Sequence, residues 1–189
     1  MPVNHVLDLL NKRRSTRAIK TVPMPIGFLE DLAEAARLTP SCANHQPWRF
    51  LFCESEESRA KANEALTGAN GAWASRAPLI VIGYANKADD CRGSHDRNYY
   101  QFDLGMAVMN IMLCATGMGL VARPMAGFNP DVLREKFDFS EGDEPLVMLA
   151  IGYPAVDESH VPEKYKGIED KPRERKSTEE IVTFLRDDT

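Results

Sequence analysis

The sequence predicts a single mixed α/β domain, and three observations support this prediction. The chain has 189 residues, a length typical of one domain and sufficient to bury a core. Segments with helical spacing alternate with short apolar runs of β type along most of the chain. No run of 18 apolar residues occurs, so no membrane-spanning helix is expected. We therefore expect one domain over residues 1–189, with an extended, charged tail at 155–189.

Each element is predicted from its spacing and its end signals. Apolar residues at helical spacing, bounded by Asn, Ser or Pro, predict helices, whereas continuous apolar runs predict buried strands. The predicted helices are a short one after Asn4, then 28–38, 55–66, 99–118, 129–137 and a tail helix within 177–185. The predicted strands are 48–54, 78–85, a short one within 119–128, and 145–154.

The longest predicted helix, 99–118, is apolar on most sides and lacks proline, so it should be central and buried. Gly105 lies inside it, where a glycine costs about 1 kcal/mol relative to alanine unless another group must approach closely. The tail at 155–189 has little apolar material of its own. It can be disordered, or it can lie on a second subunit.

Composition excludes several classes of function. The formal net charge of −5 argues against nucleic acid or an anionic membrane as the main partner. The N-terminal apolar stretch precedes the basic cluster, the reverse of a secretory signal, so a cytoplasmic protein is expected. The four cysteines form no C-x-x-C pair and no zinc-like cluster with the histidines. We expect four reduced thiols, rather than a metal site or disulfides.

Three polar stretches are candidates for binding. "RRSTR" at 13–17 offers three guanidiniums and two hydroxyls, which suits a phosphate, although these arginines could instead complement the end of the first helix. "PSCANHQPWRF" at 40–50 offers amides that suit a flat heterocycle, although it could be a turn with solvent-facing amides. "KPRERK" at 171–176 could close a phosphate site or be a solvated charge run.

No convincing side-chain nucleophile or general base is found. The chain lacks G-x-G-x-x-G, G-x-x-x-x-G-K-[ST] and G-x-S-x-G motifs. Asp89, Asp90 and Asp96 are expected in a solvated loop, and Asp103 is expected to be a structural hydrogen-bond partner. The sequence thus offers recognition of anions and heterocycles, a combination typical of an enzyme whose cofactor carries the chemistry.

Together these stretches resemble the nitroreductase family of FMN-dependent oxidoreductases. "RRSTR" is similar to that family's R-[RH]-S-x-[RK] motif, and "TPSCANHQPWRF" to its A-P-S-x-x-N-x-Q-P-W-x-F segment. "DLGMAVMNIMLCATGMGL" followed by "ARPMAGF", and "AIGYP" before a tail with "RKSTEEIV", match its later regions. The resemblance spans almost the whole chain in the right order. It implies a central, mainly antiparallel sheet flanked by helices, with the C-terminal tail extending onto a partner subunit.

The resemblance also implies site residues. Basic and hydroxyl residues near both ends would hold the FMN phosphate and ribityl chain, the amide loop would approach FMN from the other subunit, and a third loop would face the flavin N5 edge. The implied cofactor-binding residues are Arg13, Arg14, Ser15, Arg17, Ser41, Cys42, Asn44, Gln46, Pro124, Met125, Ala126, Gly127, Arg173 and Arg175. Cys42 departs from the family, where serine is common, and so do Met125 and Ala126, where Glu or Gly is common.

The implied activity is electron transfer from NAD(P)H through FMN to a nitroaromatic, quinone or related oxidised small molecule. Two FMN sites would lie at the interface of a homodimer, and both substrates would use the same place in turn, which gives ping-pong kinetics. Two alternatives remain open at this point. One is an FMN carrier or sensor without turnover, and the other is a nucleic-acid-binding module that uses the two basic clusters.

Overall fold

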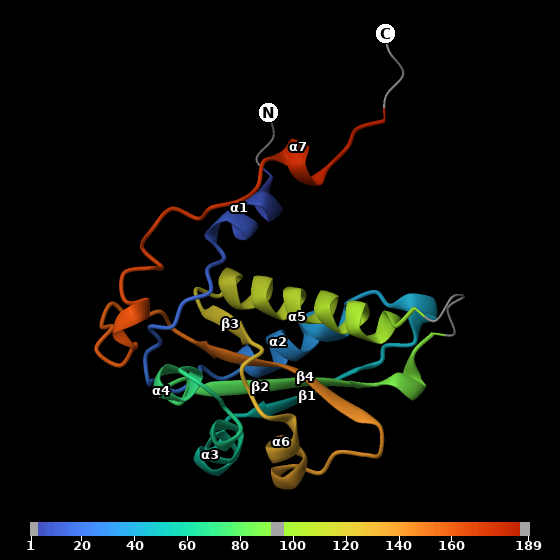
Figure 1. Cartoon of the computed structure of the whole chain (residues 1–189), viewed down its shortest axis with the longest axis horizontal. Coiled ribbons are helices and arrows are strands. Elements are labelled where there is room, and N and C mark those ends of the chain that lie inside the picture. The colour runs from blue at the N-terminus through green and yellow to red at the C-terminus, as the bar shows by residue number, and fades with distance from the viewer. Residues whose placement is uncertain (1–3, 92–96, 186–189) are drawn as a thin grey trace.

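The computed structural model describes residues 4–91 and 97–185 and places four strands among seven α-helices in these ranges (Figure 1). The helices are α1 (His5–Lys12), α2 (Phe28–Arg37), α3 (Glu56–Glu64), α4 (Asn70–Ala74), α5 (Tyr99–Gly117), α6 (Pro130–Lys136) and α7 (Thr178–Ile181). The strands are β1 (Trp48–Cys53), β2 (Leu79–Asn86), β3 (Val121–Met125) and β4 (Asp143–Gly152). None of the described helices is long and apolar enough to cross a membrane.

The sheet has the order β1-β2-β4-β3, and every neighbouring pair is antiparallel. Helices α2 and α5 cover one face, and α3 and α6 cover the other (Figure 1). Because both faces are covered, the central strand β2 is an almost continuous apolar run instead of an alternating one. This α+β architecture, with a mainly antiparallel sheet flanked by helices, confirms the predicted fold class.

Two apolar cores lie on the two faces of the sheet. Alternate residues of β2 point to opposite faces, so Leu79 and Val81 join the core under α5, whereas Ile80 and Ile82 join the core under α3 and α6. Eight residues of α5 are buried, as predicted for a central helix. The two cores thus hold α5 and the sheet together, and most of the candidate site residues lie on the segments beside them.

Two helices differ from the sequence prediction. Helix α4 occupies part of a stretch expected to be irregular, and its Trp73 is fully buried. This helix is too short for a periodic pattern, and burial of one large side chain stabilises it. In the tail, Ser177 and Glu180 form a reciprocal capping box that begins α7, yet the helix has only four residues. None of them is buried, so no packing extends the helix beyond its first turn.

The expectation of four reduced thiols is wrong for one pair, because Cys42 and Cys91 form a disulfide with a Cα–Cα distance of 5.8 Å. Cys53 and Cys114 are free, as expected. The two bonded cysteines are 49 residues apart, and the fold brings their segments together after β2. No local spacing motif could reveal such a pair.

Helices α1 and α7 lie outside the packed layers, and neither has a buried residue (Figure 1). Asn4 caps α1 as predicted, accepting hydrogen bonds from the backbone of Val6 and Leu7. The tail returns to the end of α1 through hydrogen bonds from Arg173.

Candidate cofactor site

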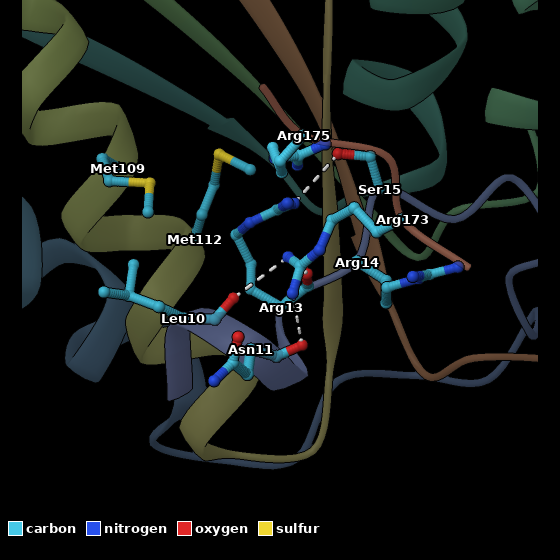
Figure 2. A pocket seen from close by; sticks show the side chains of 9 residues that line it. All are labelled: Leu10, Asn11, Arg13, Arg14, Ser15, Met109, Met112, Arg173 and Arg175. Carbon is cyan, nitrogen blue, oxygen red and sulfur yellow. Dashed lines mark hydrogen bonds between the residues drawn. The ribbon is translucent and has the colours of Figure 1, made fainter. Parts of the chain in front are cut away.

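A cavity of about 850 Å³ lies where the end of α1, the segment after it, the middle of α5 and the tail come together (Figure 2). Its lining residues are Leu10, Asn11, Arg13, Arg14, Ser15, Met109, Met112, Arg173 and Arg175. We call it the arginine cavity. The fold therefore unites the two basic stretches that the sequence predicted to form one phosphate site, although about 160 residues separate them.

The arginine cavity carries positive charge without compensation from its own walls. Four of its nine lining residues are arginines, and none is a carboxylate. Burial lowers the pKa of Arg13, and the charges of Arg173, Arg175 and Arg14 lower it further. A bound anion would offset this repulsion. The arrangement therefore favours a phosphate or another compact anion.

Hydrogen bonds to backbone carbonyls hold the arginines in place. Arg173 donates to the carbonyls of Leu10 at 3.1 Å, Asn11 at 2.8 Å and Arg13 at 3.1 Å, as Figure 2 shows in part. Carbonyls in the last turn of a helix lack partners within the helix, so Arg173 caps α1. The sequence allowed Arg13 and Arg14 to complement the C-terminal end of this helix, but in the structure Arg173 does so.

The other cations are positioned by the same two segments. Arg13 donates to the Ser15 hydroxyl at 3.1 Å, which joins two of the predicted phosphate ligands. Arg14 donates to the carbonyls of Glu169 and Lys171 in the tail. Arg175 donates only to the carbonyl of the preceding residue among the hydrogen bonds of the described chain. Arg13 and Arg175 therefore make no side-chain hydrogen bond between the tail and the N-terminal segment among the described residues, which leaves their guanidiniums available to a ligand.

Arg17 lies outside the lining of the arginine cavity. Its guanidinium pairs with the Glu169 carboxylate at 2.6 Å and stacks on the Tyr165 ring at 4.0 Å. Arg123 shares the same carboxylate at 3.4 Å and also donates to the Ser15 carbonyl. The contact of Arg17 with the cofactor stays a prediction. The contacts among Arg17, Arg123, Tyr165 and Glu169 join the tail to the N-terminal segment, and we call them the brace.

Sequence reasoning missed this brace. Glu169, Tyr165 and Arg123 were not among the candidate residues, although their side chains fix the backbone around Ser15. Glu169 is 152 residues from Arg17, and a single acid in a charged tail gives no local signal of its partner.

The amide loop, residues 41–46, has an unusual backbone. Ala43, Asn44 and Gln46 have positive φ values of 49°, 58° and 49°, a conformation that costs free energy for residues other than glycine. The Ser41 hydroxyl accepts a hydrogen bond from the Gln46 N–H at 2.9 Å, and the Cys42–Cys91 disulfide anchors the loop from outside. Asn44 and Gln46 are exposed, as a binding loop requires.

Asp103 anchors the amide loop to α5. Its carboxylate accepts a hydrogen bond from the Cys42 N–H at 3.0 Å, and its side chain is 1% exposed. Burial raises the pKa of Asp103 despite this hydrogen bond. The predicted structural role of Asp103 is confirmed. No residue of the amide loop lines the arginine cavity, because the loop meets the first turns of α5 whereas the cavity meets the helix at Met109 and Met112.

The third group of candidate residues lies where β3 ends. Met125 is a core residue, with 4% exposure, whereas Pro124 and Ala126 are exposed. The Gly127 carbonyl accepts hydrogen bonds from the Thr67 N–H and the Asn70 side chain, both at 3.0 Å.

A side chain at Gly127 would displace Asn70. A Cβ atom on this residue would lie 2.6 Å from the Asn70 amide nitrogen, so the Asn70 side chain would have to move. Asn70 thus fixes the backbone that the sequence assigned to the flavin edge, and sequence reasoning missed it because one Asn among small residues gives a weak signal.

Asp89 and Asp90, which the sequence places in a solvated loop, belong to no metal-binding cluster of the described residues. Residues 4–91 and 97–185 contain no group of three or more His, Cys, Asp or Glu side chains arranged to hold an ion. Asp90 instead accepts a hydrogen bond from the Tyr99 N–H at 2.9 Å, at the start of α5. Asp96 lies outside the described residues.

Comparisons with known proteins agree with this geometry. A sequence model described as the Nitroreductase family matches residues 10–72 and 67–153. An NADH dehydrogenase of Thermus thermophilus is 26% identical over 187 residues, covering 82% of this chain and 89% of that protein. A crystal structure of a nitroreductase family protein from Clostridium difficile superimposes with a TM-score of 0.79 and 26% identity, covering 97% and 99% of the two chains.

A second solved structure adds a cofactor to the comparison. It is described as an oxidoreductase containing FMN, and it matches with a TM-score of 0.83 and 28% identity over 100% of this chain and 94% of the other. The matched family region includes the "RRSTR" segment, the amide loop, α5 and the end of β3. The chain therefore belongs to the nitroreductase family.

Proposed function

We propose that the protein is an FMN-dependent oxidoreductase that transfers electrons from NAD(P)H to nitroaromatics, quinones or related oxidised small molecules. The arginine cavity is the observation that carries this proposal. Four arginines converge there without a carboxylate, and the pKa of Arg13 is lowered in a way that a bound phosphate would reverse. The FMN named in the similar oxidoreductase carries such a phosphate.

The chain's own residues would bind and orient the cofactor. Arg13, Arg14, Ser15 and Arg175 would contact the phosphate and ribityl chain, and Arg173 would keep the tail in place around them. The sulfur-containing side chains of Met109 and Met112 give the cavity an apolar wall on α5 (Figure 2). Such soft side chains adapt to an irregular ligand surface.

The end of β3 would serve the flavin ring. Residues 124–127 correspond to the family's loop at the flavin N5 edge. The Asn70 side chain donates a hydrogen bond to the Gly127 carbonyl and occupies the space that a Cβ atom at Gly127 would need. Preorganised backbone donors stabilise developing negative charge at little reorganisation cost.

When bound, FMN would supply the redox chemistry, taking a hydride from NAD(P)H and passing electrons to the acceptor. The protein therefore needs no nucleophile or general base, in agreement with the absence of a catalytic triad motif. Both substrates would stack in turn on the same face, so we expect ping-pong kinetics.

The complete site would require a homodimer. In one chain the amide loop does not line the arginine cavity, so the loop would act on the cofactor of a second chain. Phe102 on α5 is 61% exposed, and a Cβ atom at Gly105 would meet no atom of its own chain within 4 Å. Further exposed apolar side chains lie on α1 and in or after α7; they are Val6, Leu7, Ile181, Phe184 and Leu185. A symmetric dimer would cover them.

The test separates the two half-reactions. Anaerobic protein loaded with FMN is mixed with NADH or NADPH, and loss of flavin colour is followed; menadione or a nitroaromatic is then added alone. We expect bleaching in the first step, recovery in the second, and steady-state rates that form parallel lines in double-reciprocal plots. Electron transfer no faster than with free FMN would instead indicate a carrier.

A further inference from the structure

The Cys42–Cys91 disulfide is exposed on one side only. Cys42 lines a second cavity of about 450 Å³, together with Ser41, Tyr99, Phe102 and Met106. Cys91, in contrast, is buried, with 7% exposure. A reagent that enters this cavity therefore reaches Cys42 before Cys91, so we expect attack at the Cys42 sulfur, with the Cys91 sulfur as the leaving group.

The second cavity suits a small thiol. Its volume lies in the range of small-molecule sites. Its wall carries side chains of both charge signs, because Asp103 and Arg97 both line it, and the Arg97 guanidinium lies 5.5 Å from the centre of the Tyr99 ring. Pro40 and Phe102 give the remaining wall an apolar character.

The remaining cysteines would not compete for the reagent. Burial raises the pKa of Cys53 to about 11, and it also raises the pKa of Cys114. Both thiols therefore stay protonated at neutral pH, and only a thiolate is reactive. Among the described residues, the exchange chemistry is confined to the bonded pair.

We propose that Cys42–Cys91 is a redox-active pair which exchanges with small thiols through Cys42, and that its opening releases the amide loop. Nothing in the similarity to the nitroreductase family assigns such a pair, since the family commonly has serine at the position of Cys42.

The exchange is balanced in two steps. A thiolate RS⁻ attacks the Cys42 sulfur, which forms an R–S–S–Cys42 mixed disulfide and releases Cys91 as a thiolate. A second RS⁻ attacks the sulfur of the R group, which forms RSSR and releases Cys42 as a thiolate. Two thiols are oxidised by two electrons in total, and the protein disulfide is reduced to two thiols.

Opening the pair would change the amide loop because the disulfide is its only covalent brace among the described residues. The positive φ values at Ala43, Asn44 and Gln46 persist only while surrounding contacts enforce them. After reduction, the hydrogen bond from Cys42 to Asp103 and the bond from Gln46 to Ser41 would remain. This second part of the proposal rests on the proposed function, which places the loop on the FMN of a partner chain.

The first experiment tests the exchange itself, without reference to FMN or activity. Folded protein is equilibrated anaerobically with a series of glutathione to glutathione disulfide ratios, quenched with acid, unfolded, alkylated and weighed by mass spectrometry. We expect a shift from two to four alkylated thiols across the series, with a glutathione adduct trapped on Cys42. The rate should not depend on low urea concentrations.

Two outcomes would overturn the exchange. One is a pair that stays oxidised in excess dithiothreitol until urea unfolds the protein, which would make the disulfide purely structural. The other is an adduct found on Cys91 instead of Cys42. Wild-type protein serves for both readings, so the result does not depend on the folding of a variant.

The second experiment tests release of the loop. We expect reduction of the wild type to raise the dissociation constant of FMN about fivefold or more, the lower end of typical coupling between sites. Cys91→Ser removes the brace and leaves Cys42 in place, so it should show the weakened affinity at every glutathione ratio. Equal FMN affinity of oxidised and reduced wild type would overturn the release. Protein that binds no FMN in either state would contradict the proposed function, while the thiol count would still report on the exchange.

Discussion

The arginine cavity and the amide loop differ in how they are held. Hydrogen bonds from arginines to backbone carbonyls hold the cavity where the tail meets α1 and the segment after it. A disulfide and a buried carboxylate hold the loop, in a backbone conformation that residues other than glycine rarely adopt. The cavity has uncompensated charge, whereas the loop has restricted geometry.

This difference indicates two separate tasks. Uncompensated positive charge is suited to retaining an anionic cofactor, and a strained, anchored loop is suited to presenting amides in one fixed orientation. In one chain the two regions do not share a cavity. We therefore infer that each site of a dimer combines the arginine cavity of one chain with the amide loop of the other. The following experiments test the two regions separately.

The largest expected effect concerns the brace beneath the arginine cavity. Glu169→Ala removes the acid that pairs with Arg17 and Arg123, whose side chains are 14% and 19% exposed. Leaving buried cations unpaired should lower the free energy of unfolding by about 3 kcal/mol. Glu34→Ala breaks an exposed Arg–Glu pair of the same 2.6 Å length, so its loss of stability should be far smaller.

Urea denaturation of the two variants measures this contrast. Equal losses of stability would show that Glu169 does not brace the tail against the N-terminal segment. The loop region should be unaffected, and the Cys42–Cys91 pair should remain oxidised in both variants.

The next effect concerns cofactor retention. Arg13→Ala removes a charge-assisted hydrogen bond to the phosphate, so it should weaken FMN binding by about 2 kcal/mol, or roughly thirtyfold in the dissociation constant. Arg17→Ala should also weaken retention if Arg17 contacts the cofactor, as the sequence resemblance implies. Arg37→Ala, which removes an exposed cation on α2, is the control.

Fluorescence titration with FMN distinguishes these variants. An unchanged FMN affinity in Arg13→Ala would contradict the proposal that the FMN phosphate binds in the arginine cavity. An unchanged affinity in Arg17→Ala alone would limit Arg17 to its pair with Glu169.

A smaller effect tests whether a second chain covers α5. In an isolated chain, Gly105→Ala should raise the free energy of unfolding by about 1 kcal/mol, because its Cβ atom would meet nothing within 4 Å. In a dimer that packs closely against Gly105, the same change should instead weaken association. Gly71→Ala in α4, which also has open space around it, should not affect association. Sedimentation of the three proteins over a concentration series decides between the two outcomes.

The smallest effect is a pH dependence in the loop region. Burial raises the pKa of Asp103, so the folded state keeps the proton to a higher pH than the unfolded state. Its contribution to the free energy of unfolding is therefore greatest below the ordinary carboxyl pKa and declines as pH rises through the folded value. Asp103→Asn can still accept the Cys42 hydrogen bond and should remove this decline. A wild-type profile that matches the variant would contradict the assignment.

Sequence patterns predicted most of the fold because burial leaves a periodic signature. The apolar run of β2 and the proline-free α5 are examples, and the ends of α1 and α6 follow their capping residues. Helix α4 has too few residues to show a period. The Cys42–Cys91 pair and the Arg17–Glu169 pair join segments far apart in sequence, and only tertiary structure brings such partners together.

The candidate site was predictable to a similar extent. The phosphate-site candidates at 13–15, 173 and 175 were expected together, and they do line one cavity. The supporting residues were not predicted. Glu169 contacts the segment after α1, and Asn70 contacts Gly127, but these partners are far apart in the sequence and share no motif. Residue type therefore predicts the chemistry of the ligand, but it does not reveal which residues hold the ligand-binding side chains in place.

The most direct test of the central claim is the flavin content of the purified protein. The protein is saturated with FMN, dialysed, and unfolded by heat, and the released cofactor is identified and counted against protein chains. The account predicts a yellow protein that retains about one FMN per chain, with Arg13→Ala losing it. A colourless protein that takes up no added FMN would contradict the assignment of the arginine cavity and the electron transfer proposed from it.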